Sequence, residues 1–428
     1  MLDSGKSGLL LQVKRSPLIP IFLIVATDVL GLTIVIPLLP FYAEKYGASP
    51  IVVGWLVASY ALCQLFAGPM LGRISDRVGR RPLLLVSQVG TLIGFIILAR
   101  AESLFWIFVA RIIDGITAGN LSLAQAYISD VSAPENRAKA FGVIGISFGL
   151  GFLIGPAISG FLAQYGYHYP VWAAAGLSFL SIIATYFLLP KGRPPQHEHP
   201  DGEAKRRGIF EWNLYAQYFR RPELTAFLIQ FSLFALSFSL FVSGFALFSE
   251  RRFSFGGQPY GPREVGYLFA YAGLLGMFIQ GGLIGRLVKR FGEEKLSAVG
   301  FILAGMGYAL LGFAHHLPML ILASTVASFG SSFLRPCLTS LVSRRAHRHE
   351  QGVVLGLTQS LNSLAQIAAP ALSGLLIEYD LLSSWAFVTA SVAFAGNLVW
   401  LRHASASSAK ATGAATPQSD KLGRSNEH

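Results

Sequence analysis

Three charged residues interrupt apolar runs in the N-terminal half of the chain: Asp28, Arg111 and Asp114. An ionised side chain in the apolar interior of a membrane costs several kcal/mol, so such residues face a cavity, bind a partner or titrate. Desolvation favours the neutral form of a carboxyl group, which can then take up and release a proton near neutral pH. These residue types in this setting therefore predict a site of proton exchange.

Asp28 is the sharper candidate for a proton carrier. Our hypothesis is that Asp28 exchanges its proton against a substrate and that Arg111 sets which form of the carboxyl group is present. The alternative is a carboxylate bound near one of the two water interfaces. Arg111 and Asp114 are three residues apart and can pair on one helical face. That pair either takes part in proton transfer or only holds helices together.

Polar and aromatic residues on other apolar runs are candidates for the lining of a substrate cavity. Arg335, which precedes Pro336, is an unusual charge that either attracts an anionic group or extends its side chain to lipid headgroups. Phenylalanines recur on one face of the run 223–250, where they form either a wall for an apolar substrate or ordinary packing against lipid and core. The predicted cavity residues are Ser122, Gln125, Gln230, Phe234, Phe238, Arg335, Gln359 and Asn362.

A short basic stretch, 72–82, lies between two apolar runs and contains four arginines and a single carboxylate, Asp76. We expect a tight loop here that brings the flanking helices together. In that loop Gly79 can adopt a positive φ, and Pro82 suits the first turn of the next helix, where its missing N–H is no loss.

We interpret this stretch as a conformational latch. Arg77 and Arg80 would pair with Asp130, and Asp76 would accept hydrogen bonds at a helix N-terminus in the C-terminal half. The alternative is a basic loop that only sets the orientation in the membrane. The predicted latch residues are Gly72, Asp76, Arg77, Arg80 and Asp130.

Composition predicts the elements that position these residues. The chain has 428 residues, of which 53% are hydrophobic and only 13% are charged, whereas a soluble protein carries about 25% charged residues. Apolar runs of about 20 residues indicate helices that cross a membrane. Twelve are predicted, at 17–43, 51–72, 82–100, 104–130, 138–163, 169–190, 223–250, 263–286, 296–314, 317–343, 352–378 and 382–401.

The basic residues are distributed unevenly. Most of the 34 Lys and Arg residues fall at the termini and in alternate connections, which places both termini in the cytoplasm. The aromatic residues lie within apolar runs, so the net charge of +12 does not indicate nucleic-acid binding. We expect a cytoplasmic N-terminus (1–16), a six-helix bundle (17–190), a cytoplasmic linker (191–222), a second six-helix bundle (223–403) and a disordered cytoplasmic tail (404–428).

The two halves repeat each other. The stretch 72–79 returns at 285–292 with Lys289 in place of Asp76, and 154–160 returns at 368–374. Two similar bundles that face each other enclose a cavity on the axis between them. Small residues on the fifth predicted helix favour either close contact between the bundles or ordinary helix packing. They are Gly151, Gly155, Pro156 and Gly160.

These motifs resemble those of the major facilitator superfamily, specifically the twelve-helix drug:proton antiporter group that includes tetracycline exporters. The similarity covers nearly all of residues 17–400. The loop signature of that family matches Gly72, Asp76, Arg77, Gly79, Arg80 and Arg81; the fourth-helix signature matches Arg111, Gly115 and Gly119; and the fifth-helix antiporter signature matches Gly151, Gly155, Pro156 and Gly160. The first predicted helix, with Asp28, Gly31, Pro37 and Pro40, is also similar.

The resemblance implies an all-α membrane protein with twelve transmembrane helices in two pseudo-symmetric six-helix bundles. It implies a proton-coupled exporter of small amphiphilic molecules that works by alternating access, and in that family the arginine corresponding to Arg111 is linked to proton transfer. We expect no enzymatic activity, cofactor, metal or nucleic-acid partner. The expected partners are a small amphiphilic substrate, protons and the lipid bilayer, for a monomer in a bacterial inner membrane.

Two alternatives to this function stay open. Within the same class, the chain would transport lipids, lysolipids or metabolites by symport or uniport. In a different class, it would be a receptor or scaffold that uses the same fold without transporting anything.

Overall fold

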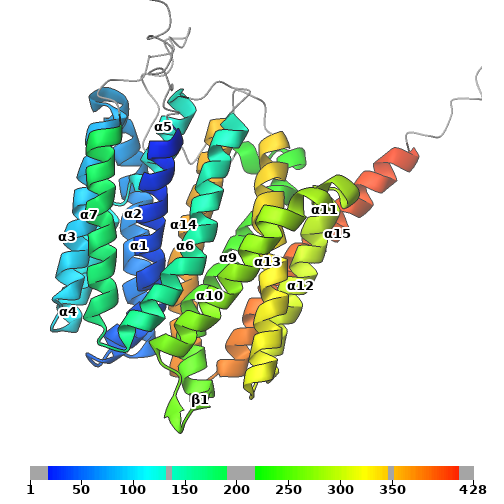
Figure 1. The fold of residues 1–428 in the computed structure, drawn as a ribbon. Helices are drawn as coiled ribbons and strands as arrows, with labels where there is room; N and C mark the ends of the chain where they lie inside the picture. Colours follow the sequence, from blue (N-terminus) through cyan, green and yellow to red (C-terminus); the bar gives the residue numbers. More distant parts are fainter. Residues whose placement is uncertain (1–17, 132–136, 190–216, 346–350, 414–428) are drawn as a thin grey trace, which may run out of the picture.

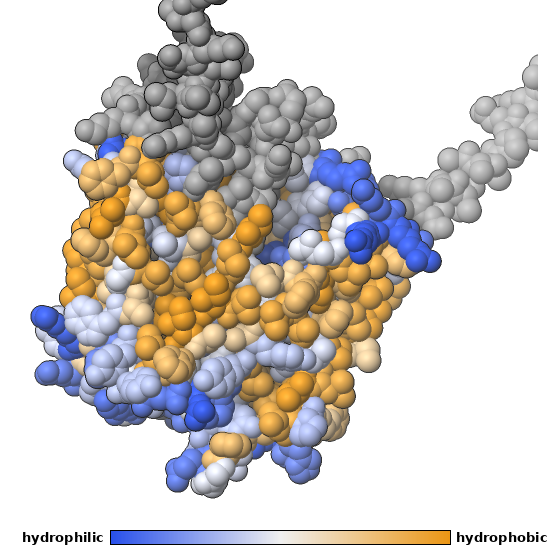
Figure 2. Space-filling model, viewed as in Figure 1, coloured by the Kyte–Doolittle hydropathy of each residue, from blue (hydrophilic) through white to orange (hydrophobic). Residues whose placement is uncertain are grey.

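The computed structural model describes residues 18–131, 137–189, 217–345 and 351–413. Within these residues, twelve helices are long and apolar enough to cross a membrane, which confirms the predicted number. Apolar side chains cover most of the middle of the visible face in Figure 2, and hydrophilic ones gather towards its ends. The surface therefore has the polarity that a bilayer requires.

The chain folds into two helical halves that lie side by side in Figure 1. The N-terminal half contains α1 (Leu18–Glu44), α2 (Pro50–Val78), α3 (Arg80–Ala99), α4 (Leu104–Ile116), α5 (Asn120–Val131), α6 (Arg137–Ala163) and α7 (His168–Leu188). The C-terminal half contains α9 (Pro222–Arg252), α10 (Pro262–Phe278), the π-helix η3 (Ile279–Leu283), α11 (Ile284–Phe291), α12 (Glu293–Phe313), α13 (Leu317–Arg345), α14 (Gln351–Glu378) and α15 (Leu382–Gly413).

A two-stranded antiparallel sheet, β1 (Ser254–Phe255) and β2 (Gln258–Pro259), connects α9 to α10. We call the end of the molecule that carries this sheet the strand end. The opposite end, where α7 ends and α9 begins, is the linker end (Figure 1).

The expected loop at 72–82 is almost entirely helical. Helix α2 continues to Val78 and α3 begins at Arg80, so Gly79 alone separates them, with a φ of 109°. Pro82 lies in the first turn of α3, as expected. Gly292, with a φ of 80°, plays the same part between α11 and α12. The repeat detected in the sequence is therefore a repeated helix–glycine–helix connection.

The fourth predicted helix, 104–130, is interrupted. Helix α4 ends at Ile116 and α5 begins at Asn120. Ser87 of α3 fills the break, because its hydroxyl donates to the Thr117 carbonyl and accepts from the Gly119 N–H at 2.9 Å. A helix can break at membrane depth only when a neighbouring side chain satisfies the freed backbone groups.

The tail is also more ordered than expected. Helix α15 continues to Gly413, ten residues into the segment that the sequence predicted to be disordered. Alanine-rich composition explains this continuation, because alanine has the highest helix propensity. The predicted N-terminus (1–16), most of the linker (191–216) and the end of the tail (414–428) lie outside the described residues.

The two halves meet at the strand end through backbone-to-backbone helix crossings. Helix α6 crosses α10 there, where a Cβ added at Gly266 would lie 2.6 Å from the Pro156 carbonyl oxygen. A Cβ at Gly160 would lie 2.9 Å from the Arg263 carbonyl oxygen. Gly151 and Gly155 have a different partner, since both pack on α1 within the N-terminal half.

The repeat makes a matching crossing on the other side. Gly54 of α2 packs on the Pro370 carbonyl of α14, and Gly374 of α14 packs on the Pro50 carbonyl. Towards the linker end the contacts disappear: an added Cβ at Gly149 of α6 or at Gly356 of α14 would meet nothing within 4 Å. As far as the described residues go, the structure is therefore closed at the strand end and spread at the linker end.

Ion pairs also join the halves at the strand end. Arg251 of α9 binds Glu44 of α1 at 2.6 Å and its neighbour Glu250 at 3.1 Å. The Ile51 N–H donates to the Glu378 carboxylate at 3.3 Å. Partly exposed ion pairs contribute at most about 1 kcal/mol. The glycine crossings, where no side chain fits, are therefore the stronger constraint on this closed end.

We expect Gly266→Leu to open the strand end. Over-packing a tight contact costs about 1–3 kcal/mol, and here the obstacle is backbone that cannot rotate away. The population closed at the strand end should fall about tenfold, which corresponds to about 1.4 kcal/mol. Spin labels at the exposed Lys45 and Gln258, on opposite halves, would report the change as longer distances.

The matched control is Gly176→Leu on α7, where an added Cβ would meet nothing within 4 Å. Glu44→Gln removes one ion pair and should shift the distances much less than Gly266→Leu. An unchanged distance distribution in Gly266→Leu would contradict this account of the closure.

Candidate functional site

Asp28 of α1 is held by side chains from two other helices. The Ser181 hydroxyl of α7 donates to Asp28 Oδ1 at 2.9 Å, and the Gln88 amide of α3 donates to the Ser181 oxygen at 2.7 Å. Ser181 and Gln88 are fully buried, whereas Asp28 is only half-buried. The carboxyl group thus ends a short hydrogen-bonded chain and keeps access to the space beside α1.

Arg111 and Asp114 form the pair that their spacing predicts. Arg111 Nη1 donates to Asp114 Oδ2 at 2.9 Å, and each side chain is only 7% exposed. The guanidinium lies over the Tyr60 ring of α2, 4.2 Å from its centroid, and the Thr91 side chain of α3 hydrogen-bonds to Asp114. A buried ion pair is tolerated only when further contacts of this kind offset the loss of water.

We expected Arg111 to act on the Asp28 carboxyl group, and the structure shows no direct contact between the two. Arg111 binds Asp114, and Asp28 binds Ser181, so the two do not pair directly. Asp28 and Asp114 nevertheless lie within electrostatic range of each other, and Tyr60 is within range of all three charges. Two carboxyl groups near one guanidinium leave one excess negative charge, which a single proton neutralises.

Arg335 of α13 lies among aromatic rings from both halves. Its guanidinium carbon is 5.6 Å from the Phe238 ring centroid and 6.0 Å from that of Phe234, both on α9, and 5.9 Å from that of Phe148 on α6. The residue is exposed, and in the described part of the chain no carboxylate lies within ion-pair distance of it. Each contact of a cation with a ring face contributes about 0.5–1 kcal/mol at an exposed site.

The other predicted cavity residues are more dispersed. Gln230 of α9 is fully buried, and neither of its amide atoms has a hydrogen-bond partner among the described residues. Ser122 is half-buried on α5, with its hydroxyl against Gly68 of α2. The structure brings Arg335, Phe234 and Phe238 together. Gln125 on α5 and Gln359 and Asn362 on α14 are half-buried, and none of the described contacts joins them to that group.

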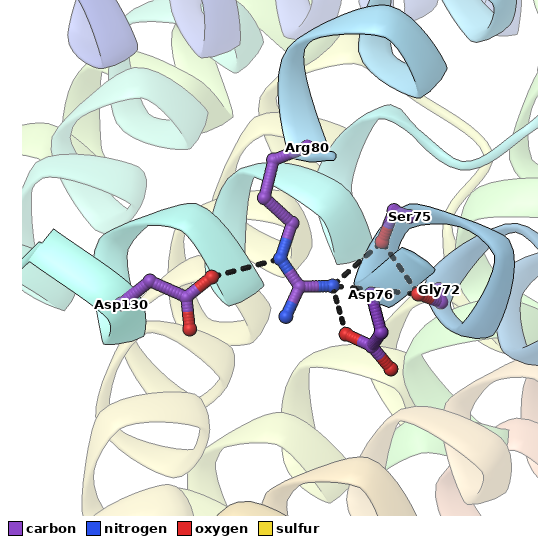
Figure 3. A network of polar contacts seen from close by, with 5 residues as sticks. All are labelled: Gly72, Ser75, Asp76, Arg80 and Asp130. Atoms are coloured by element: carbon purple, nitrogen blue, oxygen red, sulfur yellow. Dashed lines mark hydrogen bonds and ion pairs between the residues drawn. The ribbon is translucent and has the colours of Figure 1, made fainter. Parts of the chain in front are cut away.

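The latch residues gather around Arg80, as Figure 3 shows. Arg80 Nε binds Asp130 Oδ2 of α5 at 2.8 Å, and Nη1 binds Asp76 Oδ1 of α2 at 2.5 Å. The same Nη1 donates to the Ser75 hydroxyl at 2.6 Å and to the Gly72 carbonyl at 3.3 Å. The predicted pairing of Arg80 with Asp130 is therefore present.

Two expected latch contacts are absent from the described part of this structure. Arg77 is exposed, and no ion pair joins it to Asp130. Asp76, 59% exposed, pairs with Arg80 of its own half, and no described contact links it to the C-terminal half. Nor does a helix approach Gly72, where an added Cβ would meet nothing within 4 Å. These absences fit a conformation that is spread at the linker end.

Sequence reasoning missed Ser181, Gln88 and Phe148. Each is an ordinary residue in an apolar run, and its importance comes from a partner that is distant in the sequence: 153 positions for Ser181 and Asp28, and 93 for Gln88 and Ser181. The one available signal was a serine and a glutamine within predicted spans, because buried polar groups require partners. The chain has 32 phenylalanines, and nothing in the local pattern around Phe148 distinguishes it from the others.

Comparison with known proteins places the whole chain in one group. A family model described as the Major Facilitator Superfamily matches residues 21–292 and 281–424. The class B tetracycline resistance protein of Escherichia coli is 30% identical over 363 residues, which cover 83% of this chain and 86% of the relative. Multidrug resistance protein 2 of Bacillus subtilis (strain 168) is 27% identical over 381 residues, which cover 84% of this chain and 90% of the relative.

Solved structures share the fold. The human organic anion transporter TETRAN superposes with a TM-score of 0.68 at 23% identity, covering 90% of this chain and 98% of that one. The nucleoside transporter NupG superposes with a TM-score of 0.73 at 14% identity, covering 91% of this chain and 100% of that one. At these identities the likeness concerns the arrangement of helices alone.

We expect Asp114→Asn to destabilise the protein strongly. The substitution leaves the Arg111 guanidinium buried without its charged partner, which costs about 3–5 kcal/mol. Thermal unfolding in detergent would measure the loss. The double variant Arg111→Gln/Asp114→Asn should lose less than the sum of the two single variants, because neither charge is then left alone.

Asp28→Asn is the matched control for stability. Its side-chain oxygen can still accept from Ser181, so we expect a loss of about 1 kcal/mol or less. Equal losses of stability in Asp28→Asn and Asp114→Asn would show that the Arg111–Asp114 pair stabilises the fold no more than the hydrogen bond of Asp28 does.

Proposed function

The chain belongs to the Major Facilitator Superfamily, and on that basis we propose that it exports small amphiphilic molecules in exchange for protons. It is a transporter of the membrane and not an enzyme. The relatives named for tetracycline and multidrug resistance support export as the direction. The single observation that carries the proton coupling is the presence of two neighbouring carboxyl groups, Asp28 and Asp114, of which only Asp114 is paired with a guanidinium.

Asp28 is the proton carrier in this proposal. It is half-buried and has one neutral hydrogen-bond donor, Ser181, whereas Asp114 has a guanidinium within hydrogen-bond distance. The cation stabilises the ionised form of Asp114, so the excess proton belongs to Asp28. Arg111 then affects the protonation of Asp28 indirectly, because it pairs with Asp114, whose charge acts on Asp28.

Alternating access follows from the packing of the two halves. The linker end is the cytoplasmic end in this proposal, because the basic connections lie there. The structure would then be open to the cytoplasm and closed to the outside by the α2–α14 and α6–α10 crossings. Rocking about these crossings would close the linker end, and there Asp76 would reach the C-terminal half.

We expect Asp28→Asn to abolish substrate-dependent proton movement. Liposomes containing the purified protein and a pH-sensitive dye would be given tetracycline, a lipophilic cation and a lysolipid in turn. With the native chain, at least one compound should release protons, and the variant should fall to the leak rate of protein-free liposomes, since asparagine cannot carry a proton.

Glu102→Gln is the control, because it removes an exposed carboxylate between α3 and α4. Its proton flux should equal that of the native chain. Full proton-coupled transport in Asp28→Asn would refute the assignment of the carrier. Transport that ignores the pH gradient in the native chain would favour a uniporter.

We expect Asp76→Asn to slow turnover without affecting membrane insertion. Its carboxylate is 59% exposed in this conformation, so its loss costs little here and acts on the form that is closed at the linker end. Transport per inserted molecule would measure the effect. Lys289→Gln, at the corresponding position of the second repeat, should turn over normally. Normal turnover in Asp76→Asn would remove the latch from the mechanism.

A further inference from the structure

We propose that Arg335 and the three rings around it form a subsite for the anionic group of the transported molecule, and this inference rests on the function proposed above. The subsite consists of the Arg335 guanidinium, the faces of Phe234 and Phe238 on α9, and the face of Phe148 on α6. Its occupant is an amphiphilic monoanion: a carboxylate, sulfonate or phosphate diester attached to a flat or extended apolar body.

The charge of Arg335 is not neutralised by the part of the protein that the structure describes. The rings meet the guanidinium through their faces, which attracts the cation but uses none of its N–H groups. No described hydrogen bond or ion pair involves the side-chain nitrogens of Arg335. An arginine in a membrane interior without a carboxylate is costly and therefore rare unless it serves a ligand or a pathway.

Arg335, Phe148 and Phe234 lie at similar distances from the linker ends of their three helices. Arg335 lies ten residues before the end of α13 at Arg345, Phe148 lies eleven after the start of α6, and Phe234 lies twelve after the start of α9. All three positions are thus about 15–18 Å from the linker end, at a rise of about 1.5 Å per residue. The three helices have 27, 31 and 29 residues, a length of about 40–46 Å, so their ends project beyond a hydrocarbon core of about 30 Å. The three positions therefore lie within the core, on the linker-end side of its middle.

The ring contacts of Arg335 favour a position between the halves over a side chain that extends to lipid headgroups. Phe148 belongs to the N-terminal half and Arg335 to the C-terminal half, so the guanidinium lies in the space between them. Towards the linker end, an added Cβ at Gly149 of α6 or at Gly356 of α14 would meet nothing within 4 Å, so the described residues leave room beside both helices there. The residue is accordingly exposed although it lies within the membrane-spanning part of α13.

The geometry of the guanidinium selects the ligand. Its planar fork donates two parallel N–H groups to the two oxygens of a carboxylate, sulfonate or phosphate. Phe238 is half-buried, so its ring can receive an apolar body beside the charge. Gln230 precedes Phe234 by one turn of α9 and is fully buried with both amide atoms unpartnered in the described residues.

Occupancy would also assist the transport step. While the subsite is empty, closing the linker end would remove a bare guanidinium from water. A bound anion neutralises that charge, so the loaded cavity closes at a lower cost than the empty one. A substrate anion would therefore favour its own translocation.

A pair of matched probes tests the subsite: 2-naphthoate, an anion, and 2-naphthamide, its neutral isostere. Binding would be measured by fluorescence titration of the full chain in nanodiscs of zwitterionic lipid. The native chain should bind the naphthoate more tightly than the naphthamide. Arg335→Gln should weaken naphthoate binding about 10- to 100-fold, the loss expected for a charge-assisted hydrogen bond, and leave naphthamide binding within about threefold.

Three further variants separate charge, geometry and stacking. Arg335→Lys keeps the charge but not the fork, so it should bind the naphthoate with intermediate affinity. Phe238→Ala should weaken both probes alike. Arg344→Gln removes a charge from the exposed end of the same helix and should change neither affinity. Adding lysophosphatidylglycerol, with lysophosphatidylcholine as the control, shows whether a lipid anion competes for Arg335 or whether the subsite takes only soluble anions.

Two outcomes overturn the subsite: a native chain that binds the naphthoate no better than the naphthamide, or an Arg335→Gln variant with native naphthoate affinity. These outcomes are distinct from failure of the proposed function. If the subsite is wrong, proton-coupled transport of neutral or cationic compounds can continue unchanged. If Arg335-dependent naphthoate binding is observed but no compound moves protons, the subsite stands and the proposed export does not.

Discussion

The cost of placing a charge in an apolar membrane interior governs the functional part of this molecule. Every intramembrane charge described above has a distinct solution to that cost. Arg111 and Asp114 neutralise each other and rest on Tyr60. Asp28 keeps one hydrogen bond and is only half-buried. Arg335 has ring faces in place of a counter-ion. The charges of Arg111 and Asp114 are neutralised within one helix, whereas Asp28 and Arg335 have no counter-ion at ion-pair distance among the described residues. In our proposals these two are therefore the groups that take up a proton and a ligand.

The second constraint is the way two bundles can touch and still move. Large side chains at the α2–α14 and α6–α10 crossings would interlock, and the halves could not then pivot. Glycines opposite the Pro156 and Pro370 carbonyls let the backbones meet at one end with little side-chain interdigitation. The ion pair of Arg251 and Glu44 adds a contact that water can replace easily. A closure that consists of glycine crossings and a partly exposed ion pair holds the halves together and can still open.

Sequence reasoning predicted the fold well because hydrophobic run length is a local property. It predicted the twelve spans, the repeated glycine connection and the pairing of Arg80 with Asp130. It missed the break between α4 and α5, because Ser87 of another helix stabilises that break. It also missed the partner of Asp28 and the third ring beside Arg335. An intramembrane charge is visible in one helix, but the side chain that balances it belongs to a different helix.

The separation of the two chemistries suggests how they are coupled. The carboxyl groups lie in the N-terminal half, and the arginine subsite belongs mainly to the C-terminal half, with Phe148 as the contact across the gap. Direct competition between proton and substrate for one group is therefore unnecessary. Each ligand changes the net charge that its own half must carry through the apolar interior, and both halves share one rocking equilibrium. In the proposed antiport, coupling would then arise because both ligands act on that equilibrium, as linkage requires.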